Sequence, residues 1–192
     1  DERLLVQVVR NKVGQIFSMN LDGSDAREFT KPGEGLPYGI SLSPDGQRVL
    51  TRSRDRTARL WDLTGQSVAI FFGHTDELRM AVFSADGERI LTASDDRTAR
   101  LWDLEGNSLA TFSGHTDFVP SAAFSPNGQR VLTASRDMTA RQYLVNVEDV
   151  LAVAACRVGR GLIDDEIARF DIGTPRVVFE QRQCPPIFSW QK

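Results

Sequence analysis

Cysteine and histidine are scarce in this chain, and their scarcity removes several classes of function. Only two of the 192 residues are cysteine and two are histidine. Cys156 and Cys184 are too few for a disulfide framework, so we expect free thiols in a reducing, cytoplasmic compartment. No cluster of cysteine and histidine has the spacing of metal ligands, and neither a metal nor another cofactor is expected.

Long apolar runs and an excess of positive charge are also missing. No apolar stretch approaches the roughly 20 residues that a membrane-spanning helix needs. The formal net charge of -3 at pH 7 disfavours non-specific binding to nucleic acid. We therefore expect a partner that is neither a membrane nor a nucleic acid.

The chain does contain one ten-residue sequence segment that occurs twice with a single difference. The ten residues from Arg54 read RDRTARLWDL, and the ten residues from Asp95 read DDRTARLWDL. The two copies differ only at their first position and start 41 residues apart. A catalytic site needs its residues once, whereas a phrase repeated at fixed spacing predicts a structural unit that is stacked.

Three further marks recur at the same spacing of 41 residues. The first is SPDG from Ser43, which returns as SADG from Ser84 and as SPNG from Ser125. The second is GHTD, which begins at Gly73 and again at Gly114. The third is a Ser-x-Asp-x-Thr turn that begins at Ser53, Ser94 and Ser135. Periods of about 40 to 45 residues with Gly-His and Trp-Asp pairs mark propeller blades. Over roughly residues 36–145 the chain resembles the WD40 repeat family.

The resemblance implies an all-β fold, a β-propeller of four-stranded blades that forms part of a ring. In the clearest repeat we expect strands a to d at 79–84, 89–94, 99–104 and 108–112. Residues 1–35 are expected to form a degenerate partial blade, with strands at 4–9, 15–21 and 26–30. Residues 36–145 would then hold two full blades and one partial blade, whose strands are expected at 120–124, 130–135 and 140–144.

The repeat pattern ends at Asn146, and residues 146–192 are predicted to form a separate C-terminal tail. Asn146 is a suitable helix N-cap, and apolar residues then recur at helical spacing. The pattern predicts a helix over about 147–158, docked against the edge of the last blade or beneath the ring through Val150, Leu151, Ala154 and Val158.

In the WD40 family a His, a Ser or Thr, an Asp and a Trp form a structural hydrogen-bonded chain within each blade. The resemblance assigns these roles to His74, Thr92, Asp96 and Trp102, and again to His115, Thr133, Asp137 and Tyr143, where a phenol replaces the indole. An earlier repeat has Thr51, Asp55 and Trp61, but Gly33 stands where the histidine would be.

The same residue types could instead form a His-Asp-Ser/Thr catalytic triad. Both histidines lie in the Gly-His-Thr-Asp motif at the repeat spacing, which favours the structural role. We therefore expect no enzymatic activity. Cys156 falls beside the apolar stripe of the predicted helix, and a buried, inert thiol is favoured over a nucleophile.

The turns between strands b and c and the loops between strands d and a should rise on one face of the ring. Arg54, Arg56, Arg97 and Arg136 in the turns could form an anion-attracting collar, but solvated turn positions are the favoured interpretation. The loops of this face carry Asp76, Glu77, Arg79, Asp117 and Phe118. Phe118 is either an exposed contact anchor or a side chain packed between blades.

These features predict a non-catalytic protein–protein interaction scaffold or sensor. The chain resembles the C-terminal portion of bacterial multidomain WD40-repeat proteins, so upstream blades or another copy would complete the ring. Two alternatives stay open: a regulatory domain of an enzyme whose catalytic part lies upstream of residue 1, and a self-assembling half-propeller. No recognised ligand motif identifies the protein partner.

Overall fold

The computed structural model describes residues 3–10, 13–30 and 37–145, and this part of the chain consists of strands, turns and loops without a helix. The chain divides into two units, Asp1–Tyr143 and Leu144–Lys192. The tail and its predicted helix over 147–158 lie outside the described residues, as does Gly33.

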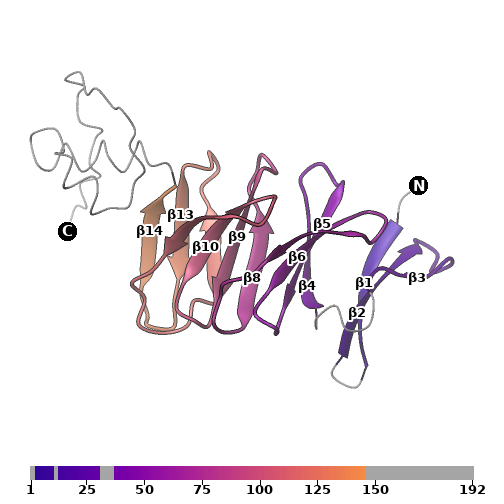
Figure 1. Cartoon of the computed structure of the whole chain (residues 1–192), viewed down its shortest axis with the longest axis horizontal. Coiled ribbons are helices and arrows are strands. Elements are labelled where there is room, and N and C mark those ends of the chain that lie inside the picture. The colour runs from indigo at the N-terminus through magenta and orange to yellow at the C-terminus, as the bar shows by residue number, and fades with distance from the viewer. Residues whose placement is uncertain (1–2, 11–12, 31–36, 146–192) are drawn as a thin grey trace, which may run out of the picture. The chain divides into compact units, whose positions relative to one another are not determined.

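The described strands form four consecutive antiparallel sheets, shown in chain order in Figure 1. The first sheet contains β1 (Arg3–Arg10), β2 (Val13–Asn20) and β3 (Arg27–Glu28). The second contains β4 (Pro37–Leu42), β5 (Arg48–Ser53), β6 (Ala58–Asp62) and β7 (Ser67–Phe71). The third contains β8 (Leu78–Phe83), β9 (Arg89–Ser94), β10 (Ala99–Asp103) and β11 (Ser108–Phe112). The fourth contains β12 (Ser121–Phe124), β13 (Arg130–Ala134) and β14 (Ala140–Leu144).

Within each sheet, neighbouring strands are consecutive in the sequence, which is the meander expected for a propeller blade. Each expected strand is present, and the strand ends differ from the sequence expectation by no more than two residues. The prediction of an all-β fold built from four-stranded antiparallel units is therefore confirmed.

The Ser-x-Asp-Gly motif closes the turn between the first two strands of a sheet. Between β4 and β5, the Ser43 hydroxyl accepts the Arg48 N–H at 2.9 Å and the Asp45 carboxylate accepts the Gln47 N–H at 3.0 Å. Gly46 has a φ of 69°, a left-handed conformation that glycine adopts without steric cost. The motif therefore recurs because the same turn has to be made in each repeat.

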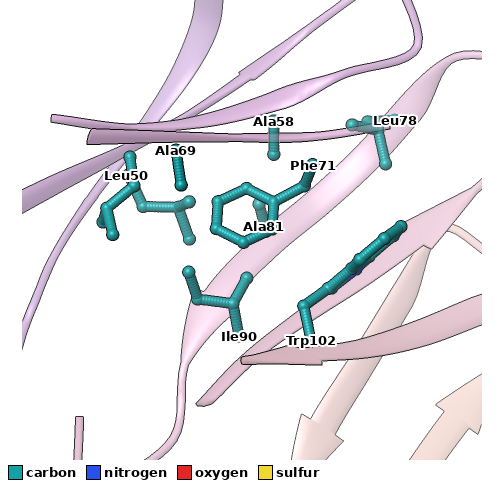
Figure 2. Packing of buried hydrophobic residues seen from close by; sticks show 9 residues of the cluster. Leu50, Ala58, Ala69, Phe71, Leu78, Ala81, Ile90 and Trp102 are labelled. Atoms are coloured by element: carbon teal, nitrogen blue, oxygen red, sulfur yellow. The ribbon is translucent and has the colours of Figure 1, made fainter. Parts of the chain in front are cut away.

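Adjacent sheets pack face to face because successive residues of a strand point to opposite sides. On β5, Val49 packs toward the first sheet in a cluster with Ile16, whereas Leu50 packs toward the third sheet in a cluster with Ile90. Figure 2 shows the second of these clusters. A sheet with two buried faces buries successive residues of its central strands, as Val49, Leu50 and Thr51 on β5 show.

One aromatic pair recurs at each junction between sheets. A phenylalanine at the outer edge of one sheet packs against the third strand of the next, in the pairs Phe29–Trp61, Phe71–Trp102 and Phe112–Tyr143. The ring centroids lie 6.3, 5.9 and 5.0 Å apart in that order. The first two pairs are edge-to-face, an arrangement that stabilises by roughly 0.5–1.5 kcal/mol beyond area burial.

A glycine at the turn between the last two strands of a sheet lets that turn approach the preceding sheet. Gly65 has a φ of 83°, and a Cβ added there would lie 2.7 Å from the carbonyl oxygen of Phe29. Gly106 occupies the same place one repeat later, with a φ of 95° and the carbonyl oxygen of Ile70 at 3.0 Å from an added Cβ. An added Cβ would therefore clash with the Phe29 carbonyl at Gly65 and crowd the Ile70 carbonyl at Gly106.

Candidate functional site

A buried polar network lies in the third sheet and contains the four residues assigned to its tetrad. Trp102 Nε1 is 2.8 Å from Thr92 Oγ1, which is 2.8 Å from His74 Nε2. His74 Nδ1 is 2.7 Å from Asp96 Oδ2. An indole can only donate and a carboxylate can only accept, so the bonds run in one direction. The indole N–H donates to the hydroxyl, the hydroxyl donates to Nε2, and Nδ1–H donates to the carboxylate.

Asp96 also connects two loops of the same face. Its Oδ2 accepts the N–H of Thr75, which lies in the loop between β7 and β8, at 3.0 Å. Its Oδ1 accepts the N–H of Thr98, in the turn between β9 and β10, at 3.0 Å. Burial acts to raise the pKa of Asp96, but hydrogen bonds from His74 and Thr98 outweigh it and hold this pKa well below its usual range. The carboxylate is therefore ionised at neutral pH and clamps the loop to the turn.

The fourth sheet repeats the clamp around Asp137. His115 Nδ1 lies 2.8 Å from Asp137 Oδ2, and His115 Nε2 lies 2.8 Å from Thr133 Oγ1. Asp137 accepts the backbone N–H groups of Thr116 at 3.0 Å and Thr139 at 2.9 Å. The hydrogen bond from the Thr139 hydroxyl is the main cause that lowers the pKa of Asp137. The same loop-to-turn connection is thus made twice.

Tyr143 does not substitute for the indole in the way the sequence predicted. Its hydroxyl donates to the carbonyl oxygen of Ser113 at 2.9 Å instead of bonding to Thr133. The phenol carries its O–H at the far end of the ring, whereas an indole carries its N–H on the side of the ring. The ring of Tyr143 still packs on Phe112, so the substitution keeps the aromatic contact and redirects the polar one.

The second sheet has a shorter network in which an arginine stands near the carboxylate. Trp61 Nε1 donates to Thr51 Oγ1 at 2.9 Å, as in the third sheet. Asp55 Oδ1 accepts the Thr57 N–H at 2.9 Å, and Arg59 Nη2 lies 3.5 Å from Asp55 Oδ2. The oxygen that accepts from a histidine in the other two sheets is here paired with a guanidinium.

Comparison with known proteins identifies the repeat. The family model described as "WD domain, G-beta repeat" matches residues 27–62, 65–103 and 106–143, which is more than half of the chain. The chain belongs to the WD40 family. Each match begins at or just before the outer strand of one sheet and ends in the third strand of the next, so the sequence repeat and the structural blade are offset by one strand.

The chain is also similar to a human relative over one short segment. Human "WD repeat-containing protein 86" is 61% identical over 36 residues. This alignment covers 18% of the present chain and 10% of the relative's length. The likeness therefore concerns a single WD40 repeat, and the partners of a whole protein do not follow from it.

Three of the predicted surface residues of the second and third blades take part in ion pairs. Arg79 binds Asp95 with Nε at 2.8 and 2.9 Å from the two carboxylate oxygens, and its Nη2 lies 3.4 Å from Glu77. Arg54 is exposed and lies 3.8 Å from the same glutamate. Glu77, Arg79 and Arg54 thus form one ion-pair chain across the blade boundary, so these two arginines are not free cations.

Three turn tips of this face have left-handed backbone conformations without a glycine. They are Arg56, Arg97 and Met138, with φ values of 72°, 71° and 64°. All three side chains are exposed, and that of Met138 is the most exposed large apolar side chain of the described residues, at 95%. Left-handed L-residues cost of order 1 kcal/mol each, and such strain concentrates at functional sites.

The sequence allowed Phe118 to be either an exposed contact anchor or a side chain packed between blades, and its exposure in the structure is intermediate. It is half-buried, and the exposed Arg136 places its guanidinium carbon 5.6 Å from the centre of the ring. The Arg136 N–H also donates to the Phe118 carbonyl at 2.9 Å. Asp76 and Asp117 accept the N–H of the following residue, at 2.8 and 2.7 Å, so both carboxylates shape their loops.

Sequence reasoning missed a cluster around Tyr38 at the start of β4. The guanidinium carbons of Arg52 and Arg54 lie 4.6 and 5.6 Å from the centre of its ring, and its hydroxyl donates to the Leu78 carbonyl. Tyr38 precedes Arg79 by one period of 41 residues. Comparing the same position across repeats would have identified Tyr38, because Arg79 was already a candidate.

The described part of the chain holds neither a cluster of metal-binding side chains nor a helix that could span a membrane. Over 3–10, 13–30 and 37–145, no three His, Cys, Asp or Glu side chains are placed to hold a metal ion. No helix in the same residues is long and apolar enough to cross a membrane.

Proposed function

We propose that the chain is a non-catalytic module that binds a protein partner through the loop face. We define the loop face as the b–c turns of the last three blades together with the d–a loops at residues 75–77 and 116–118. The clamp made by Asp96 carries this proposal. Its carboxylate fixes a d–a loop to a b–c turn by hydrogen bonds of 3.0 Å on each side, and Asp137 does the same one blade later. Loops held in this way lose little conformational entropy when a partner binds.

The non-catalytic part of the proposal rests on the surroundings of Thr92. Asp96, His74 and Thr92 are spaced like a catalytic triad, but Thr92 is only 1% exposed. Its oxygen already accepts the Trp102 N–H. A nucleophile has to meet a substrate atom, and this hydroxyl is closed off from any substrate.

A protein fits the loop face better than a nucleic acid does. The face mixes exposed arginines with the carboxylates of Asp76 and Glu77, and the chain carries a net charge of -3. Phosphate binding is favoured by cations of one sign, whereas proteins are recognised by mixed charges around aromatic anchors. We also propose a cytoplasmic location, because two cysteines in the chain suit a reducing compartment.

The proposal extends to the protein context of this module. The first and fourth sheets have three described strands each, whereas a complete blade has four. Propellers typically hold about four to eight blades. These observations support an array that is continued by blades of a longer protein or of another copy.

Proximity labelling followed by purified binding measurements tests the loop face. The face variant carries alanine at Arg56, Arg97 and Arg136, and the control variant carries alanine at Gln47, Glu88 and Gln129, in the a–b turns at the opposite strand ends. We expect a partner that binds the parent and the control variant and binds the face variant at least tenfold more weakly. Equal binding of that partner to the face variant would refute the proposal.

A further inference from the structure

The fourth sheet exposes apolar residues whose counterparts in the earlier sheets are buried. Leu132 is 52% exposed, whereas Leu50 and Leu91, two periods and one period of 41 residues earlier, are 1% and 0% exposed. Ala140 is also exposed, and Ala99, at the same place in the third sheet, is 0% exposed. The same positions are therefore buried in the two sheets that have a following sheet, and exposed in the fourth.

The exposed side of the fourth sheet is the side on which a following sheet packs. Leu50 lies in one cluster with Ile90, which belongs to the third sheet, so this position points to the next sheet along the chain. Leu132 occupies that position in the fourth sheet, and alternation along β13 places Ala134 on the same side. We call Leu132, Ala134 and Ala140 the fourth-sheet face.

The first sheet has an apolar side that points away from the second sheet. Ile16 packs toward the second sheet in the cluster that contains Val49. Phe17 follows Ile16 and therefore points to the opposite side, as does Val6, its direct partner on β1. Phe17 and Val6 are half-buried, whereas Val49 and Ile90, which face the preceding sheet from their own sheets, are 0% exposed. We call Val6 and Phe17 the first-sheet face.

The junctions within the chain show what fits these two faces. Between the second and third sheets, the side that carries Leu50 packs on the side that carries Ile90, as Figure 2 shows. The fourth-sheet face corresponds to the first of these two sides, and the first-sheet face corresponds to the second. Among the described sheets, none covers either face. The packing already established between sheets of this chain therefore indicates the first sheet of another copy as the occupant of the fourth-sheet face.

The size of the faces favours a closed pair of copies. Each face spans three short strands, or roughly 15 Å by 15 Å. A stable interface takes about 800 Å² from each partner, so one junction alone is small, and a closed pair joins the two faces twice. Two copies of four sheets make eight sheets, which lies within the range of about four to eight blades in propellers. A head-to-tail contact that closes gives a ring instead of an open filament.

We propose that two copies of the chain pack head to tail, with the fourth-sheet face of each copy against the first-sheet face of the other. The inference rests on the proposed continuation of the array and names a second copy as its source. Gln142 is exposed and stands where Leu60 and Leu101 are buried, so this junction is more polar than those within one chain. That polarity suits copies that fold separately and then associate.

Light scattering on the full chain over a range of concentrations measures the association. We expect the parent to have twice the mass of one chain, and Leu132→Glu to raise the dissociation constant at least tenfold. Leu109→Glu, on β11, is the matched control, because Leu109 is also 52% exposed but lies outside both faces. Both leucines are exposed, so neither change should unfold the chain. A monomeric parent, a parent of more than two chains, or equal masses for the two variants would overturn the proposal.

Mixing two variants tests the head-to-tail arrangement. Val6→Lys changes the other face and should be monomeric by itself. The Leu132→Glu chain keeps its first-sheet face and the Val6→Lys chain keeps its fourth-sheet face, so an equal mixture should restore a species of two chains. Circular dichroism checks that both variants are folded, and Phe17→Ser replaces Val6→Lys if that variant is not. A mixture of folded variants that stays monomeric would overturn the proposal. The loop-face variant changes none of these residues, so its binding result is judged separately.

Discussion

Replacing His74 with alanine is expected to destabilise the third blade strongly. The change leaves the Thr92 hydroxyl without its acceptor and Asp96 without its Nδ1–H donor. Both side chains are buried, and an unsatisfied buried group costs about 1–3 kcal/mol. Asp96 keeps its hydrogen bonds from Thr75 and Thr98, so its share lies at the low end of that range. The total expected loss is about 2–4 kcal/mol in the free energy of unfolding.

Urea denaturation followed by tryptophan fluorescence measures this loss, because Trp102 is part of the network. Arg97→Ala is the matched control in the same blade, since its side chain is exposed and an exposed substitution changes stability by less than about 0.5 kcal/mol. If His74→Ala and Arg97→Ala unfold at the same urea concentration, the network does not stabilise the blade and the reasoning is refuted.

Three further changes probe single contacts. Trp102→Phe should cost about 2–3 kcal/mol in a urea titration, because it removes the hydrogen bond to Thr92 and shrinks a fully buried side chain, which leaves a cavity; an unchanged free energy of unfolding would contradict this. Gly65→Ala should lower the melting temperature more than Gly46→Ala, because both have positive φ but only Gly65 faces a neighbouring atom, the Phe29 carbonyl; equal melting temperatures would show that the contact is soft. Asp96 has a lowered pKa when folded, so its charge stabilises above its unfolded pKa of about 4 and this contribution is lost as the pH falls below that value. The stability gap between the parent and Asp96→Asn should therefore narrow between pH 5 and pH 2, and a gap that does not change with pH would refute this role.

The sequence predicts the strands of this fold well because the same turn-forming residue types recur in each repeat. Ser43 and Gly46 make a turn whose hydrogen bonds are local, and the same residue types recur 41 residues later. Strand positions therefore follow from the period alone. The contact of Phe71 with Trp102 could not be predicted from a local sequence pattern, because it depends on how two blades pack against each other.

The polar site was predictable only where the residue types match the family. His74 and His115 hold their expected partners, because the repeat spacing brings the same atoms together. Tyr143 differs because the position of a hydroxyl on its ring decides which acceptor it reaches. Arg59 was missed because its approach to Asp55 depends on side-chain conformation, which residue spacing does not fix.

Hydrogen exchange at four backbone amides tests the central claim, that buried aspartates preorganise the loop face. Asp96 holds the amides of Thr75 and Thr98, and Asp137 holds those of Thr116 and Thr139. In Asp96→Ala we expect the Thr75 and Thr98 amides to exchange at least tenfold faster than in the parent, while the Thr116 and Thr139 amides keep their protection. Unchanged exchange at Thr75 and Thr98 in a folded Asp96→Ala variant would contradict the claim.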